Sequence, residues 1–169
     1  LRAECRPGIT TAELDQVSAA VIARMGAQPS FLGYEGYPAT VCISINEEIV
    51  HGIPSNRVVQ FGDLVSFDCG AYIVDSRGRQ WHGDAAFSMI CGGEEHASDD
   101  DLQLLATTER SLWAGIAALA KAEHVNEIGD AIEEVVAEDA ARFGWEAGIV
   151  EEYTGHGIGT AMHQAPDVL

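Results

Sequence analysis

The sequence is poor in positive charge. Its 169 residues include nine Lys and Arg against 27 Asp and Glu, which gives a formal net charge of −18. A surface of this sign repels phosphate backbones and anionic lipid headgroups, so the charge argues against nucleic acid and membranes as partners. The 47% hydrophobic content suffices for the core of an ordinary domain, and we expect one domain over residues 1–169.

Several signatures are missing as well. No run of about eighteen apolar residues predicts a transmembrane helix, and the opening LRAECRPGIT lacks the pattern of a signal peptide. The four scattered cysteines form no C-x-x-C pair, which indicates reduced thiols and a cytoplasmic location. Neither a G-x-S-x-G nucleophile elbow nor a phosphate-binding glycine loop is present, so we set aside serine hydrolases and nucleotide-binding enzymes.

Helix and strand patterns alternate along the chain. A capping box at residues 10–13 predicts a helix that ends near Gly26, and amphipathic repeats predict two more helices within 98–120 and 124–143. Apolar alternation predicts four strands, with strand-like sequence again after Gly144; the four span 40–45, 48–51, 64–74 and 79–91. The first and third helix patterns are similar, which suggests two halves of similar composition with a site between them.

Two aspartates occur in the last pair of these strands. The expected turn at 75–78 lies midway between Asp68 and Asp84, so an antiparallel hairpin brings the carboxylates opposite each other within a residue or two. Facing carboxylates repel each other unless a cation lies between them, and hard carboxylate oxygens suit divalent metals. The alternative is that one aspartate faces solvent or flanks an ordinary polar turn.

Three histidines stand beside glycine or proline at strand ends, where functional groups are often placed: His51 in VHGIP, His156 in GHGIG, and His163. A single histidine is more often a hydrogen-bonded structural residue, but the repeated pattern favours function. The remaining three histidines are predicted to be structural or at the surface, although His82 is close enough in sequence to orient Asp84.

Four segments in order carry a family resemblance: LGYEGYPATVCISINEEIVHGIP, GDLVSFDCG, WHGDAAF and EYTGHGIGTAMHQAP. Together they resemble the bacterial, type 1 methionine aminopeptidases, and the likeness runs from about Cys5 to the end of the chain. The resemblance implies the α/β pita-bread fold, in which two pseudo-symmetric halves surround a site with two metal ions.

The resemblance also implies roles for individual residues. Asp68 would bind one metal, Asp84 would bridge both, and His156 would bind the second; the two divalent ions would be Co, Mn, Fe or Zn. A hydroxide between metals about 3.5–4 Å apart would attack the peptide carbonyl. His163 would hydrogen-bond the substrate carbonyl, and His51 would contact the amide nitrogen. The methionine pocket would be lined by Phe31, Tyr34, Tyr37, Cys42 and Met162.

The implied function is removal of the initiator methionine from nascent polypeptides. The resemblance also implies a monomer that contacts the ribosome transiently. The alternatives are an X-Pro aminopeptidase or prolidase of the same fold, and a binding module that has lost catalysis.

The sequence departs from the family pattern in three places. Two glutamates that complete the family's metal set would lie beyond the residues present here, and the N-terminal helix is clipped, so we expect a chain incomplete at both ends. The stretch from Asp68 to Asp84 is also longer than usual, and a change in hairpin length can turn one side chain to the other face.

Overall fold

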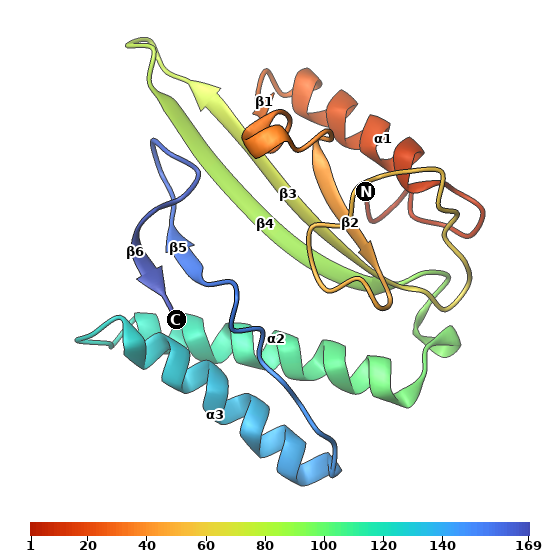
Figure 1. The fold of residues 1–169 in the computed structure, drawn as a ribbon, viewed down its shortest axis with the longest axis vertical. Coiled ribbons are helices and arrows are strands. Elements are labelled where there is room, and N and C mark those ends of the chain that lie inside the picture. The colour runs from red at the N-terminus through yellow and green to blue at the C-terminus, as the bar shows by residue number, and fades with distance from the viewer. The chain divides into compact units, whose positions relative to one another are not determined.

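The structure is a computed structural model that describes residues 1–169, and it divides into two compact units. Unit 1 comprises Leu1–Asp99 with Ile158–Met162, and unit 2 comprises Asp100–Gly157 with His163–Leu169. Both units contain helices and strands (Figure 1). No helix combines the length and the apolar character that crossing a bilayer requires.

Unit 1 is built around a four-stranded sheet. Its elements are α1 (Thr11–Arg24), β1 (Gln28–Pro29), the short helix η1 (Tyr34–Gly36), β2 (Val41–Ile45), β3 (Leu64–Val74), β4 (Gln80–Ile90) and η2 (Glu94–His96). The predicted capping box is present: the Glu13 backbone N–H donates to the Thr10 hydroxyl, and the Glu13 carboxylate accepts from the Thr10 backbone N–H at 2.8 Å. These bonds satisfy backbone donors that the first turn of a helix leaves unpaired.

Strand β3 is the centre of the sheet. It pairs with β4 in an unbroken antiparallel register from Leu64 opposite Ile90 to Val74 opposite Gln80. Its other edge pairs with β2 and, further along, with the two residues of β1. The long β3–β4 hairpin dominates this unit in Figure 1, and its regular register confirms the predicted turn at 75–78.

The two faces of the sheet have different compositions because side chains alternate along each strand. One face belongs to the hydrophobic core, which includes Val41, Ile43, Ile45, Val65 and Phe67 together with Leu14 of α1. The other face carries rungs of small and polar residues, such as Ser44–Ser66–Ser88 and Cys42–Asp68–Ala86. The core face therefore stabilises the unit, and the second face carries the polar side chains of the sheet.

The predicted strand at 48–51 is wrong. Asn46 has a left-handed backbone with φ of 55°, and the Glu48 N–H donates to the Ile45 carbonyl, so the chain turns away where β2 ends. Ile49 and Val50 are 70% and 46% exposed. Apolar residues alone suggested a strand here, but no neighbouring strand takes up their backbone hydrogen bonds.

Unit 2 contains two antiparallel helices and a small sheet. Its elements are α2 (Asp99–Leu119), α3 (Asn126–Phe143), β5 (Gly155–Gly157) and β6 (Gln164–Val168). The Thr107 hydroxyl and the Arg110 guanidinium of α2 both donate to the buried carboxylate of Asp139 in α3. Strand-like sequence was expected from Gly144 onward, but regular pairing is limited to the short β5 and β6.

Candidate functional site

Asp68 and Asp84 lie on the same face of the β3–β4 hairpin. Asp68 pairs with Ala86 and Asp84 pairs with Gly70, so the two aspartates are diagonal neighbours. Diagonal positions of this kind are about 7–8 Å apart at their Cα atoms, within reach of a shared ligand. Neither side chain is turned to the other face, because β3 and β4 pair without a bulge from these residues to the turn.

An apolar cluster lies in the same unit. Phe31, Cys42 and Met162 are buried together, and Tyr37 packs against them with its ring edge-on to Phe31 at a centroid distance of 6.4 Å. Cys42 pairs directly with Asp68 across β2 and β3, which puts its thiol on the face of the aspartates. Four of the five predicted pocket residues thus meet in one place, while Tyr34 lies outside the cluster and is 42% exposed.

Burial sets the protonation of the polar groups in this cluster. Burial raises the pKa of the Tyr37 phenol, and its hydrogen bond to Cys42 raises it further. Burial likewise raises the pKa of the Cys42 thiol, with a smaller contribution from the negative charge of Asp68. Both groups are therefore neutral near pH 7, and Cys42 is suited to line an apolar pocket rather than to act as a thiolate.

His51 is held beside β2 by its neighbour Gly52. The Gly52 carbonyl accepts hydrogen bonds from the Ile43 N–H and from the Tyr37 hydroxyl, both at 2.9 Å. A β-carbon on Gly52 would overlap the Ile43 carbonyl oxygen, so only glycine permits this close approach. His51 itself has a left-handed backbone with φ of 59°, a costly conformation that fits a functional position.

The other two predicted histidines are in unit 2. The rings of His156 and His163 contact each other edge-to-face with centroids 4.3 Å apart. His156 Nδ1 lies 3.0 Å from the Gly157 carbonyl oxygen, which accepts its proton. This bond leaves Nε2 as the nitrogen that can bind a metal, in the arrangement usual for histidine ligands.

No three His, Cys, Asp or Glu side chains are arranged as a metal-binding group in the structure. The available donors nevertheless suit a divalent cation in kind, because two carboxylates share one face and each provides hard oxygen atoms. Their mutual repulsion also favours a bound cation. The chemistry of these two carboxylates is therefore compatible with a divalent metal.

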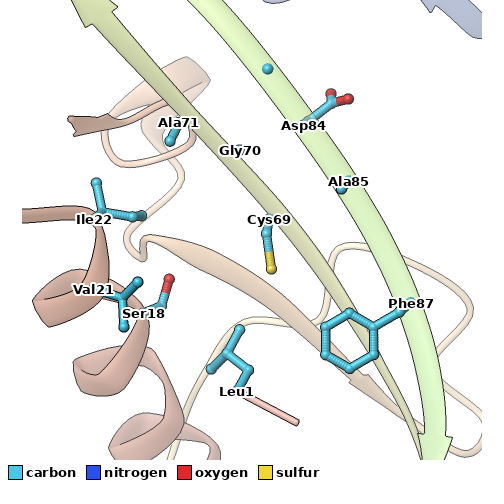
Figure 2. A pocket seen from close by; sticks show the side chains of 11 residues that line it. Leu1, Ser18, Val21, Ile22, Cys69, Gly70, Ala71, Asp84, Ala85 and Phe87 are labelled. Atoms are coloured by element: carbon cyan, nitrogen blue, oxygen red, sulfur yellow. The ribbon is translucent and has the colours of Figure 1, made fainter. Parts of the chain in front are cut away.

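A cavity of about 450 Å³ lies on the opposite face of the hairpin, against α1. Figure 2 shows the side chains of Cys69, Ala71 and Phe87 turned toward it and the carboxylate of Asp84 turned away. Asp84 borders this cavity through its backbone, since its side chain belongs to the other face. This cavity is thus separate from the face that carries the Asp68 and Asp84 side chains.

Sequence reasoning missed two features of the site. Gly70, opposite Asp84, leaves the space against which the ring of Phe31 packs. Ser30, just before Phe31, lies 2.9 Å from His82 Nδ1. A glycine opposite the second aspartate of a predicted hairpin was a signal that the sequence did contain, because glycine inside a strand often marks a close approach.

The whole chain, residues 1–169, matches the model of metallopeptidase family M24. It is 46% identical over 167 residues to a methionine aminopeptidase 1 of Mycobacterium tuberculosis, and the match covers 98% of this chain but 60% of that protein.

Two solved structures extend the comparison. A methionine aminopeptidase from Rickettsia prowazekii superposes with a TM-score of 0.83 at 27% identity, over 98% of this chain and 61% of the other. A prolidase from Pyrococcus horikoshii shares the fold, with a TM-score of 0.68 at 21% identity over 98% of this chain and 43% of the other.

These matches confirm the predicted α/β pita-bread fold class, and methionine aminopeptidases are more similar to the chain than the prolidase. The chain spans about 60% of the length of the relatives named here as methionine aminopeptidases. From the aspartates that share one face, the apolar cluster beside them and the match along its full length, the chain belongs to metallopeptidase family M24.

Proposed function

We propose that this chain is the substrate-binding and part of the metal-binding region of an aminopeptidase that removes N-terminal methionine from polypeptides. The observation that carries the proposal is the position of the apolar cluster. Phe31, Tyr37, Cys42 and Met162 form a compact neutral lining, and Cys42 pairs directly with Asp68. A methionine side chain is apolar and polarizable, so such a lining beside a metal-binding carboxylate suits it.

Each polar residue then has a distinct task. Asp68 and Asp84 bind divalent metal through their carboxylates, together with His156 through Nε2. His51 contacts the amide nitrogen of the scissile bond, and His163 hydrogen-bonds the substrate carbonyl oxygen. Tyr34, which is 42% exposed, is proposed to line the methionine site from outside the buried cluster.

Two ions of Co, Mn, Fe or Zn are proposed as the cofactor. When bound, such ions polarise the substrate carbonyl and supply a nucleophile at neutral pH. This chain's own contribution is to hold the ions with carboxylates on a rigid hairpin and to fix the methionine side chain next to them.

The proposed substrates are the N-termini of nascent polypeptides. The names of the relatives support methionine as the residue removed, because the M. tuberculosis protein is a methionine aminopeptidase. A monomeric state, a transient ribosome contact and a cytoplasmic location remain predictions. So does the assignment of both units to one catalytic domain over residues 1–169.

The metal assignment is tested by calorimetric titration of Mn²⁺ into the chain and into two variants. Asp84→Asn removes a proposed ligand, whereas Asp75→Asn changes an aspartate at the tip of the same hairpin. We expect Asp84→Asn to weaken Mn²⁺ binding by at least about tenfold and Asp75→Asn to leave it unchanged. Equal affinities in all three proteins would overturn the metal assignment.

The activity is tested by comparing hydrolysis of Met-Ala-Ser and Ala-Pro-Ser with Mn²⁺ or Co²⁺ present, using the full-length M. tuberculosis relative as a positive control. Release of methionine from Met-Ala-Ser alone would support the proposal. Cleavage of Ala-Pro-Ser at a similar rate would favour the X-Pro alternative. Metal binding by this chain with cleavage only by the relative would mean that hydrolysis needs the part of the relative that this chain does not span. Absence of metal binding would point to a binding module.

A further inference from the structure

His82 lies in β4 two residues before Asp84, with its ring on the same face of the hairpin. It pairs with Tyr72 of β3, and the two rings are in contact at a tilt of 33° with centroids 4.9 Å apart. None of the roles proposed above uses this histidine. Its contacts nevertheless reach two segments that contribute to the apolar cluster.

The ring of His82 contacts the segment that carries Phe31. His82 Nδ1 lies 2.9 Å from the Ser30 hydroxyl, and Nε2 lies 3.1 Å from Gln80 Oε1. Because an amide oxygen only accepts, Nε2 carries the proton and Nδ1 accepts from the Ser30 hydroxyl. The Ser30 backbone N–H donates to the Gly70 carbonyl at 3.0 Å, so Ser30 is held from two sides.

The backbone of His82 contacts the segment that carries Met162. Its N–H donates to the Gly159 carbonyl at 2.7 Å, and the Gly159 N–H donates in turn to the Ala161 carbonyl at 3.1 Å. Residues 158–162 belong to the same unit as the hairpin. His82 therefore connects the segment that carries Phe31 and the segment that carries Met162 to β4, the strand that contains Asp84.

Because position 70 is a glycine, the ring of Phe31 packs directly against β3, and a small displacement of Ser30 changes this contact. Gly70 pairs with Asp84, and the ring of Phe31 fills the space where a β-carbon on Gly70 would lie. If Ser30 moves, the adjacent Phe31 ring moves over the Asp84 rung. The position of the methionine site relative to the carboxylates then changes, although no residue that touches substrate has been altered.

We propose that His82 is a positioning residue, whose ring sets the methionine-binding cluster relative to Asp84 through Ser30, while its backbone N–H holds Gly159 in place. This inference rests on the proposed function for its meaning, since the cluster is taken to bind methionine. The contacts that define it do not depend on the reaction. Its test therefore needs a readout that is separate from peptide hydrolysis.

The first readout is the methyl resonance of Met162 in protein labelled with [¹³C-methyl]methionine. The chain has three methionines, and the other two serve as internal references: Met25 is 73% exposed, and Met89 packs against the main core. We expect His82→Ala and Ser30→Ala each to move the Met162 signal toward that of exposed Met25. The Met89 signal should stay in place, which shows that the fold is intact.

Three further variants sharpen this test. His124→Ala is the matched control, because His124 is an exposed residue of unit 2, and it should leave the Met162 signal unmoved. His82→Asn keeps an acceptor near the position of Nδ1 and should restore part of the native signal. The double variant His82→Ala with Ser30→Ala should shift the signal no further than His82→Ala alone, because both changes break one contact.

The second readout is the selectivity for Met-Ala-Ser over Leu-Ala-Ser. Displacement of the cluster should lower kcat/KM for Met-Ala-Ser at least about tenfold in His82→Ala, with most of the loss in KM, while metal affinity is kept. An unmoved Met162 signal in both His82→Ala and Ser30→Ala would overturn the positioning role. If His82→Ala fails to fold, as a shifted Met89 signal would show, Ser30→Ala decides alone. Failure of the unmodified chain to bind Mn²⁺ would count against the proposed function and leave the NMR result valid.

Discussion

The ring of Phe31 occupies the space that a side chain at Gly70 would need, with Phe31 Cε1 only 2.5 Å from the position of a Gly70 β-carbon. Since Gly70 pairs with Asp84, an aromatic ring and a carboxylate meet at one rung of the hairpin. The rung thus joins the apolar cluster to the face that carries the two aspartates, so a change at Gly70 should affect both.

Replacing Gly70 with alanine should therefore displace Phe31. We expect Gly70→Ala to destabilise the chain by about 1–3 kcal/mol, because an added methyl group overpacks a filled site. Urea unfolding measures this change, and Met-Ala-Ser hydrolysis should fall with it. Gly83→Ala is the matched control, because a β-carbon there meets nothing within 4 Å. Equal stability of the two variants would show that the ring adapts freely.

Gly52→Ala tests how His51 is held. A β-carbon at Gly52 would overlap the Ile43 carbonyl oxygen, so the loop must move away from β2. We expect a loss of stability on the order of 1–3 kcal/mol together with a loss of activity. By contrast, His51→Asn keeps a residue type that tolerates left-handed backbone, so it should lower activity and leave urea unfolding nearly unchanged. An active Gly52→Ala variant would mean that this close approach does not position His51.

Asp139 links the two helices of unit 2 and should make that unit sensitive to acid. Its hydrogen bond with Thr107 and its contact with Arg110 lower the pKa of this carboxyl below its usual 3.8. A lowered pKa in the folded state stabilises the fold above the unfolded value, and this stabilisation is lost as the pH falls through the folded value. Unfolding followed by circular dichroism between pH 5 and about 2 should show a steeper loss of helix than in Asp139→Asn.

Glu138→Gln provides the control for this prediction. Glu138 also approaches Arg110, at 3.4 Å, but its side chain is 61% exposed. Exposed ion pairs contribute little, so this variant should retain the acid sensitivity of the unmodified chain. If Asp139→Asn retained it as well, the buried carboxylate would not be its source.

The tip of the β3–β4 hairpin is held together by Asp75. Its carboxylate accepts from Trp81 Nε1, from Arg79 Nε and from two backbone N–H groups, which lowers its pKa to about 2. Asp75 stabilises the tip above the ordinary aspartate value, and protonation near pH 2 should release Trp81. A change in Trp81 fluorescence with a midpoint near pH 2, absent in Asp75→Asn, is the expected result. A midpoint near 4 would mean that the carboxylate is not held in this way.

The sequence predicted the parts of the site that local patterns determine. The turn at 75–78 lies midway between Asp68 and Asp84, and antiparallel pairing then requires the two to be near one another. The structure adds that the strands pair without a bulge, which places both aspartates on one face. The proximity of the two aspartates follows from spacing and was accessible before the structure, whereas their shared face depended on a register that the sequence left open.

Contacts between distant segments were not accessible in the same way. No pattern in the sequence indicates that Ser30 would meet His82, 52 residues away, or that Gly52 would press against Ile43. The apolar run at 48–51 even pointed to a strand, because hydrophobicity does not reveal whether a partner strand is available. Tertiary packing determines these two contacts and the absence of a strand at 48–51, and it cannot be inferred from the local patterns of a single sequence.

The ladder of the β3–β4 hairpin continues without a bulge to Val74 opposite Gln80, where the Asp75 cluster closes it. Each added rung supplies one residue to each strand, so lengthening the ribbon by whole rungs leaves the pairing of Asp68 and Asp84 as it is. The length of this arm can therefore vary in steps of two residues without changing how Asp68 and Asp84 are placed relative to each other. For the same reason, the turn at Ser76–Gly78 is a natural place for an engineer to graft an epitope or a tether.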